Sequence, residues 1–322
     1  MSAATAPEIS AVIPCLNEAE NAANIAAAVG TELAKAGVTY EIIFIDNGSI
    51  DGTVDIVKSL CESDPRIRLI VNNQNYGQMR SPTHAIYQAT GTGAVIGICA
   101  DFQDPPEMLG EFIARWRAGA MIVLGVRHAE DVWIGTKLLR DVGYGFFKRF
   151  ADYRVIPGAT GFGLYDRRVV DTLREWREPE PFFRGMLVES GYRLETIPYH
   201  RPPRAGGTSK NNFFTLVDFA ISSLAGSSRN LLRLPLYAAV ITGLTAGTTA
   251  LIALIVALTG RSGWLWLAWA VGQAAFSLLS LFLGLIGEQV RVLAQVARNV
   301  PLVIEQERVN FPARSDGSSE RG

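Results

Sequence analysis

Short apolar segments alternate with helical patterns along about the first 130 residues of the chain. Five segments are almost entirely apolar, which is typical of strands buried on both faces of a sheet. They are residues 9–14, 40–46, 67–72, 94–101 and 121–127. The Ala-rich stretch 18–37 lies between the first two and ends in a glycine, so it predicts a helix. Strands that alternate with helices predict an α/β fold with a mostly parallel sheet.

Two long apolar segments follow in the second half of the chain. Residues 235–259 form 25 positions without a charged side chain, and residues 264–286 form 23 more. As helices they would be about 37 and 34 Å long, enough to cross a hydrocarbon core of about 30 Å. A buried helical hairpin is the alternative. We expect a transmembrane hairpin, because soluble cores rarely contain two such segments in tandem.

The flanks of these segments predict an orientation. The connector 260–263 is short enough only for a tight hairpin, so both flanks lie on one side of the membrane. Only Arg261 lies between the segments, whereas four arginines flank them: Arg229, Arg233, Arg291 and Arg298. This bias predicts a multi-pass protein of the cell membrane whose large N-terminal domain is cytoplasmic. The first residues lack a secretory signal pattern, which agrees with that orientation.

Polar side chains lie at or just after the carboxyl ends of four of the five predicted strands. They are Asn17 and Glu18, Asp46, the group Asp101, Gln103 and Asp104, and Arg127. Each has an ordinary alternative as a helix cap or a turn residue. Ligands of α/β sheets collect beyond the carboxyl ends of the strands, so we expect these side chains to share one site.

The acidic corner after the fourth strand predicts a divalent cation. The chain contains neither GxGxxG nor GxxxxGK[ST], so a bound diphosphate would need a metal ion or arginines. Mg²⁺ often binds through one or two carboxylates, and substrate phosphate and water complete its ligands. Asp101, with Gln103 or Asp104 nearby, is chemically sufficient for that purpose.

The net charge and the cysteines bear on three other possibilities: nucleic-acid binding, a cysteine metal site and disulfides. The net charge is −1, so no overall basic field indicates nucleic acid. Cys15, Cys61 and Cys99 share no metal-type spacing, and disulfides are not expected in a cytoplasmic domain. We therefore expect all three to be small buried residues. We also expect His84 to pack or hydrogen-bond locally, and Asp166 to cap the helix that follows it.

Taken together, the motifs resemble those of the family-2 glycosyltransferases of GT-A fold. The segments that carry this resemblance are IPCLNEAEN, EIIFIDNGSIDGT, NQNYGQ, ADFQDPPE and VLGVR. Further segments, GFGLYDRRVVDTL, FFRGM and YHRPPRAGGTSK, are similar to the polyprenyl-phosphate branch, which includes dolichyl-phosphate mannose synthases. The resemblance covers roughly residues 8–312.

The resemblance implies a Rossmann-like GT-A domain, amphipathic helices and a two-helix transmembrane hairpin. It implies an inverting enzyme that moves one sugar from a nucleotide-sugar, preferably UDP-linked, to polyprenyl phosphate with Mg²⁺ or Mn²⁺. A homotetramer in the bilayer is a further implication. The expected parts are the glycosyltransferase domain 1–210, a juxtamembrane helix 211–233, the hairpin 234–287, an amphipathic helix 288–312 and a disordered tail 313–322.

The same resemblance implies roles for individual residues. Asp101 and Gln103 would bind the metal. The residues expected to act in catalysis are Asp101, Arg127, Arg204 and Lys210. The residues expected to bind the donor are Pro14, Asn17, Glu18, Asp46, Asn47, Gly77, Gln78 and Arg201.

Three positions depart from the family pattern. Cys99 stands where the family usually has the first Asp of D-x-D, and Gly161 stands where it has an Asp before a phenylalanine. The DDGS motif is weakened to Asp46-Asn47. A sugar hydroxyl acceptor needs a base, whereas a phosphate monoester has a second pKa near ~6 and arrives deprotonated. The missing carboxylate at Gly161 therefore argues more against a hydroxyl acceptor than against a phosphate.

Two basic segments would serve the lipid acceptor. Residues 137–150 interleave Lys and Arg with aromatic side chains, which suits a membrane surface, although an ordinary solvated helix is the alternative. Residues 201–210 place Arg201, Arg204 and Lys210 on a Pro- and Gly-rich loop that could close over phosphates.

Two other functions remain open. A processive polysaccharide synthase would share the fold, but the chain lacks a Q-x-x-R-W motif and further spans. A membrane-anchored nucleotide-sugar-binding or scaffold protein is favoured by the missing carboxylates. The retained Asp101, Gln103 and basic residues argue against it.

Overall fold

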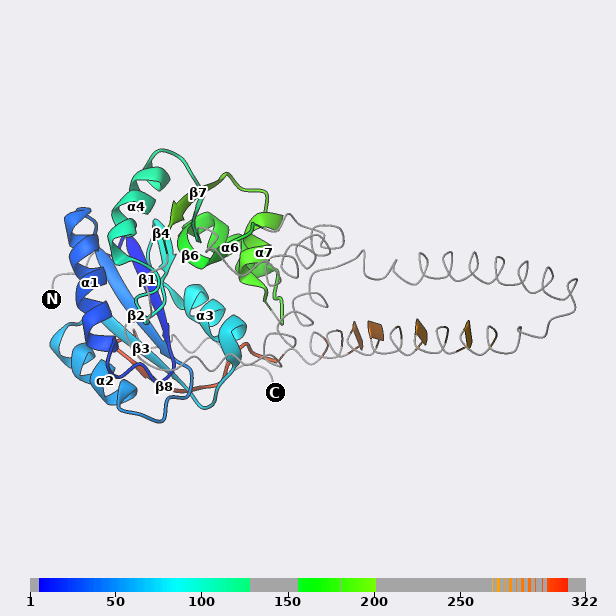
Figure 1. Cartoon of the computed structure of the whole chain (residues 1–322). Helices are drawn as coiled ribbons and strands as arrows, with labels where there is room; N and C mark the ends of the chain where they lie inside the picture. Colours follow the sequence, from blue (N-terminus) through cyan, green and yellow to red (C-terminus); the bar gives the residue numbers. More distant parts are fainter. Residues whose placement is uncertain are drawn as a thin grey trace, which may run out of the picture. The chain divides into compact units, whose positions relative to one another are not determined.

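The computed structural model describes residues 6–127, 156–179, 181–200 and 300–311, together with single positions and pairs between residues 268 and 297. Figure 1 shows a twisted sheet that has helices on both faces. The elements, in chain order, are β1 (Ile9–Cys15), α1 (Ala22–Lys35), β2 (Tyr40–Asp46), α2 (Thr53–Ser63), β3 (Ile67–Asn72), α3 (Gly77–Gln88), β4 (Ala94–Gly97), the 3₁₀ turn η1 (Pro106–Met108), α4 (Leu109–Arg117), β5 (Ile122–Arg127), β6 (Ala159–Asp166), α6 (Arg167–Glu175), α7 (Phe183–Glu189), β7 (Leu194–Tyr199) and β8 (Glu305–Val309).

The described strands form one mixed sheet in the order β7-β5-β6-β4-β1-β2-β3-β8. The central strands β4, β1, β2 and β3 are parallel to one another, and β5 is parallel to β7. Strands β6 and β8 run antiparallel to their neighbours. The expected parallel core is confirmed, and the whole sheet is less uniformly parallel than the sequence predicts.

Two apolar layers cover the sheet, one on each face. Helices α1, α2 and α4 pack on the face that presents Ile13 of β1 and Phe44 of β2. Helices α3, α6 and α7 pack on the other face, which presents Val12 and Ile43. Successive side chains of a strand point to opposite faces, so strands covered on both sides must be apolar at nearly every position. This explains the continuous apolar runs of the sequence.

A buried charged cluster lies at the amino end of the central strands. Arg68 Nη1 of β3 lies 2.6 Å from Glu41 Oε2 of β2, and the Glu41 side chain is only 2% exposed. The other carboxylate oxygen of Glu41 accepts hydrogen bonds from Ser10 Oγ and from Thr90 N and Oγ1. The Arg68 guanidinium also lies over the Phe311 ring, 5.3 Å from its centroid. This cluster joins three strands and the segment that follows β8.

The predicted amphipathic helix 288–312 is wrong for its last part, because Glu305–Val309 form strand β8. Pro301 has no backbone N–H, and the residue before a proline is driven toward extended backbone, so a helix is disfavoured there. Strand β8 instead pairs with the edge of β3. Asn310 Nδ2 donates to the carbonyls of Cys61 and Ile67, which fixes the end of the strand.

Side chains of α3 also hold this C-terminal segment. His84 Nε2 lies 2.5 Å from Glu305 Oε1, so its partner is 221 positions away and not local as expected. Arg80 donates to the carbonyls of Leu302 and Pro301. Burial disfavours the Glu305 carboxylate, yet hydrogen bonds from Arg308 and His84 lower its pKa to about 2. The carboxylate is therefore ionised at neutral pH and anchors β8 to the α3 side of the sheet.

The chain divides into two compact units. One comprises residues 1–139, 155–211 and 300–322, and the other comprises residues 140–154 and 212–299. The expected domain 1–210 is thus completed by a distant segment. Within the residues that the structure describes, we find no helix that is long and apolar enough to cross a membrane. The expected segments 137–150, 211–233 and 313–322 lie outside the described residues, as does most of 234–287.

Candidate active site

The carboxyl ends of strands β1, β2, β4 and β5 meet at one edge of the sheet, as the sequence predicts. In the pairing register Cys15 lies opposite Asp46, and Gly97 of β4 lies level with Val12 of β1. Strand β5 reaches the same edge because it is antiparallel to β6, which is antiparallel to β4. The described loops after β1, β2 and β4 therefore lie at the same edge as the end of β5, and they form the candidate site.

The loops after β1 and β2 are tied to each other. Asn17, with a φ of 56°, donates its backbone N–H to Ser49 Oγ at 2.8 Å, and its side-chain oxygen accepts from Ile50 N at 2.9 Å. The buried Glu18 accepts from Asn21 Nδ2 at 2.7 Å and donates its backbone N–H to Thr53 Oγ1 at 2.9 Å. Asn17 and Glu18 thus fix the loop after β1 against the loop after β2, and Pro14 is partly exposed in β1.

Asp46 organises the turn after β2. One of its carboxylate oxygens accepts from the backbone N–H groups of Gly48 and Ser49 at 3.0 and 2.9 Å. The side chain is buried, and the other oxygen lies 4.0 Å from Cys15 Sγ. Asp46 therefore presents a rigid turn at the place where the resemblance implies a nucleoside contact.

Asn47 connects this turn to the loop before α3. Its Nδ2 donates to Asn75 Oδ1 at 2.8 Å and to the Gly77 carbonyl at 3.2 Å, while its Oδ1 accepts from Tyr76 N at 2.9 Å. These contacts engage both ends of the amide within the protein, so we interpret Asn47 as a structural residue. Gly77, with a φ of 81°, and Gln78 are exposed beside it and can face a ligand.

Replacing Asn47 with aspartate, which restores the family motif, is expected to destabilise the protein. The new carboxylate oxygen would face two acceptors, Asn75 Oδ1 and the Gly77 carbonyl, at the cost of about 1–3 kcal/mol. Thermal unfolding should show the loss, and Asn24→Asp at an exposed position of α1 is the control. An unchanged midpoint for Asn47→Asp would contradict the assignment.

The acidic corner after β4 divides into an open part and a buried part. Asp101 and Gln103 are partly exposed, and Gln103 N donates to Asp101 Oδ1 at 3.2 Å across a turn in which Phe102 has a φ of 56°. Cys99 is exposed, so its expected burial is wrong, whereas Cys15 and Cys61 are buried as expected. The shorter β4 explains this difference, because the chain has left the sheet before Cys99.

The open part fits a hard divalent cation. The Asp101 carboxylate and the Gln103 amide would offer oxygen ligands, and Mg²⁺ needs few protein ligands when a diphosphate supplies others. Among the described residues, no three His, Cys, Asp or Glu side chains are grouped to hold a metal ion without a substrate. The geometry is therefore compatible with a metal that arrives with the donor diphosphate.

Asp104 lies in the buried part and contacts Tyr199, to which the sequence analysis assigned no role. Its Oδ1 accepts from Tyr199 Oη at 2.8 Å, and its Oδ2 accepts from Cys99 N at 3.3 Å. Burial raises the pKa of Asp104, an effect that these bonds and Arg127 partly offset. Burial and the charge of Asp104 also raise the pKa of Tyr199 to about 12. The sequence signal for Tyr199 is its place as the first residue of the segment YHRPPRAGGTSK.

Gly161 adopts a backbone that disfavours the carboxylate expected from the family. Its φ is 97°, a region that residues other than glycine rarely adopt, and its carbonyl accepts a hydrogen bond from Tyr165 Oη. Asp166 caps α6 by accepting from Arg168 N at 3.0 Å, as predicted. Arg201, Arg204 and Lys210 lie outside the described residues.

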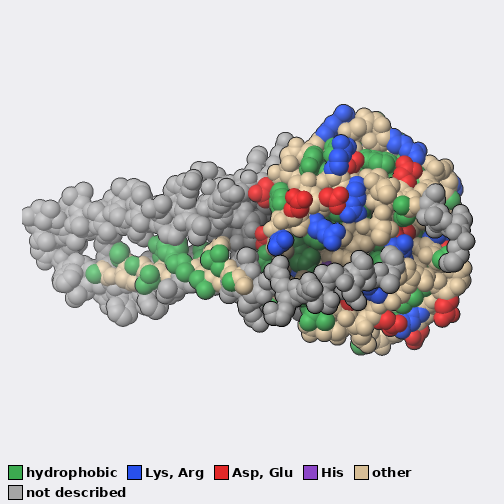
Figure 2. Space-filling view, turned by 180° about the vertical axis from the view of Figure 1, so that it is seen from behind, with side chains coloured by type: hydrophobic (Ala, Val, Ile, Leu, Met, Phe, Trp, Pro, Cys, Tyr) green, Lys and Arg blue, Asp and Glu red, His purple; other side chains and the backbone are tan. Residues whose placement is uncertain are grey.

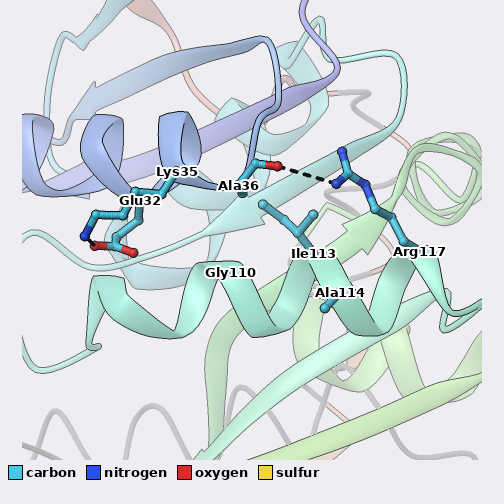
Figure 3. Close-up of a pocket in the computed structure, with 7 residues that line it drawn as sticks. All are labelled: Glu32, Lys35, Ala36, Gly110, Ile113, Ala114 and Arg117. Carbon is cyan, nitrogen blue, oxygen red and sulfur yellow. Dashed lines mark hydrogen bonds and ion pairs between the residues drawn. The ribbon is translucent and has the colours of Figure 1, made fainter.

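A groove between α1 and α4 lies elsewhere on the domain (Figure 3). Ile113 and Ala114 line it together with charged side chains from both helices, and Arg117 Nη1 donates to the Ala36 carbonyl at 3.4 Å. Its residues come from helices and not from the loops after the strands. We therefore do not assign this groove to the active site.

Comparison with known proteins identifies the family of the chain. The sequence model of Glycosyl transferase family 2 matches residues 10–174. The uncharacterized glycosyltransferase YkcC of Bacillus subtilis is 30% identical over 281 residues, which are 83% of each chain. A prophage bactoprenol glucosyl transferase homolog of Escherichia coli K12 is 30% identical over 233 residues, 71% of this chain and 75% of the relative.

One solved structure is similar to this chain at low identity. It is a mannosyltransferase from Pyrobaculum calidifontis in complex with GDP-Man and Mn²⁺, at 18% identity and a TM-score of 0.41, covering 91% of this chain and 87% of the other. The family match extends over more than half of the chain and includes the loops after β1, β2, β4 and β5. The chain belongs to glycosyl transferase family 2 and is a glycosyltransferase.

Proposed function

We propose that this glycosyltransferase moves one sugar from a nucleotide-sugar, preferably UDP-linked, to a polyprenyl phosphate. The observation that carries the proposal is Gly161, because its left-handed backbone stands where the family resemblance implies a catalytic carboxylate. A lipid phosphate is already deprotonated near neutral pH and needs no such base. The similarity to bactoprenol glucosyl transferases supports the same acceptor class.

The chemistry is a single in-line displacement at the anomeric carbon. The lipid phosphate oxygen forms the new bond as the bond to the nucleoside diphosphate breaks, so the anomeric configuration inverts. Arg127 at the end of β5 stabilises phosphate charge at this edge. Asp101 and Gln103 would hold a divalent cation, which neutralises charge on the leaving diphosphate when it is bound. The loops of Asp46 and Asn17 orient the donor.

We further propose that the reaction occurs at the cytoplasmic face of the cell membrane. The two uncharged segments and their arginine flanks support this location. Large apolar side chains at described positions of the segment 268–297 are more than half exposed, namely Leu279, Ile286, Val290 and Leu293. Figure 2 shows hydrophobic side chains in green among the described residues of this segment. Exposed apolar surface of this kind suits contact with lipid.

The proposal predicts a lipid-extractable product. Purified protein in detergent with Mn²⁺ should transfer label from a UDP- or GDP-sugar to polyprenyl phosphate and not to polyprenol, its matched hydroxyl acceptor. Equal transfer to polyprenol would contradict the role given to Gly161. A product with retained anomeric configuration would contradict the single displacement. Donor binding without any product would favour the scaffold function that Cys99 and Gly161 also suggest.

A further inference from the structure

One buried tyrosine lies between a carboxylate and a guanidinium at the edge of the proposed active site. Strands β5 and β7 are parallel, and their register places Arg127 opposite Tyr199. Tyr199 Oη donates to Asp104 Oδ1 at 2.8 Å and accepts from Arg127 Nε at 3.3 Å. The hydroxyl therefore joins the loop after β4 to the last residue of β5.

Asp104 has a second contact that reaches the proposed metal ligands. Its other carboxylate oxygen accepts from the backbone N–H of Cys99, two residues before Asp101. Asp101 in turn accepts from Gln103 N. One carboxylate thus holds the backbone on which Asp101 is placed and, through Tyr199, the side chain of Arg127.

The tyrosine has little freedom to move. Its ring contacts Phe162 edge-on, with centroids 5.5 Å apart. A Cβ added to Gly125 would lie 3.2 Å from Tyr199 Cε1 and 2.6 Å from Phe162 Cδ1, so the two rings occupy the space that a side chain would need. Tyr199 is 6% exposed and Asp104 is 1% exposed. Such packing fixes the hydroxyl and keeps Asp104 from contacting a substrate directly.

We propose that Asp104 and Tyr199 are positioning residues that hold Arg127 and the Asp101 turn in the geometry needed for donor binding. The inference rests on the proposed function, because Arg127 and Asp101 are assigned to the donor diphosphate there. Preorganised charges are effective because they need not reorganise during the reaction, and their supporting contacts carry part of that effect.

A double-mutant cycle tests this inference. Tyr199→Phe removes only the hydroxyl and should weaken binding of UDP or GDP with Mn²⁺ about tenfold, the effect of one hydrogen bond to a charged group. In an Arg127→Ala background, Tyr199→Phe should weaken nucleotide binding hardly any further, because the guanidinium that the hydroxyl positions is absent. Titration calorimetry measures binding without turnover, and kcat and KM for any lipid product are measured in parallel.

The control is Tyr87→Phe, which removes a partly buried hydroxyl that lies away from the site and donates to the Leu173 carbonyl at 3.1 Å. It should leave binding unchanged. Additive losses for Tyr199→Phe and Arg127→Ala, or equal losses for both tyrosines, would overturn the positioning role. Asp104→Asn provides a second test, since it should raise the Mn²⁺ concentration at half-maximal binding, which Tyr199→Phe should not.

The outcomes separate this inference from the proposed function. Coupled losses in nucleotide binding without any lipid product would support the positioning role and contradict the transfer reaction. Normal product formation with uncoupled losses would do the reverse. Failure of the wild-type protein to bind UDP and GDP with Mn²⁺ would overturn both.

Discussion

Replacing Asp101 with alanine is expected to lower kcat by about 100- to 1,000-fold, the usual effect of removing one group that stabilises transition-state charge. Cys99 occupies the place of the first Asp of the family's D-x-D motif. Asp101 is therefore the only carboxylate of that motif in this chain, and no second one can take over its role. Its carboxylate lies in the open part of the acidic corner, where a metal-held diphosphate would leave. Formation of lipid-linked sugar is the measurement, at several Mn²⁺ concentrations.

The matched control for this prediction is Glu107→Ala. Glu107 is an exposed carboxylate in η1, a few residues after Asp101. It should keep wild-type turnover and an unchanged Mn²⁺ requirement. Asp101→Ala should also need more Mn²⁺ for half-maximal activity. Full turnover of Asp101→Ala would show that the cation, if one is used, is held elsewhere.

Replacing Arg68 with alanine is expected to lower the free energy of unfolding by about 3–5 kcal/mol, because it leaves a buried carboxylate without its cation. Glu41 is almost fully buried and pairs with Arg68 at 2.6 Å. The loss also removes the contact with Phe311, which follows β8. Unfolding by urea in detergent, followed by tryptophan fluorescence, measures the effect.

The control is Arg66→Ala, two residues away. Arg66 is 54% exposed on its side chain and pairs with Asp64 at 2.8 Å. Exposed pairs contribute about 0–1 kcal/mol, so this variant should remain close to wild type. The double variant Arg68→Met with Glu41→Gln should recover much of the loss, since both charges are then absent. Equal destabilisation by the two arginine variants would show that burial does not decide the effect.

Some strands were predictable from the sequence because both of their faces are covered. Strands β1, β2, β3 and β5 are apolar at nearly every position for that reason. Strand β7 escaped prediction because only alternate positions near its end are buried, which leaves a weak apolar signal. The insertion of β6 between β4 and β5 is a non-local pairing that local periodicity does not encode.

The site was predictable at the level of strand ends and not at the level of side-chain partners. Parallel strands necessarily bring Asn17, Asp46 and Asp101 to one edge, so their spacing in the sequence was informative. The partners of Asn47 and Asp104 depend on the loop before α3 and on the register of β7. Those contacts join residues 28 and 95 positions apart, and no local pattern distinguishes an amide that binds a ligand from one that braces a loop.

Strand β8 has a consequence for any shortened form of this enzyme. The residues that complete the sheet come after the second compact unit, so a fragment that ends near residue 210 would lack them. The edge of β3 would then present unpaired backbone groups, and such edges promote aggregation. Arg68 and His84 would lose Phe311 and Glu305 as well. A soluble catalytic fragment should therefore keep residues 300–311, joined by a linker in place of the second unit.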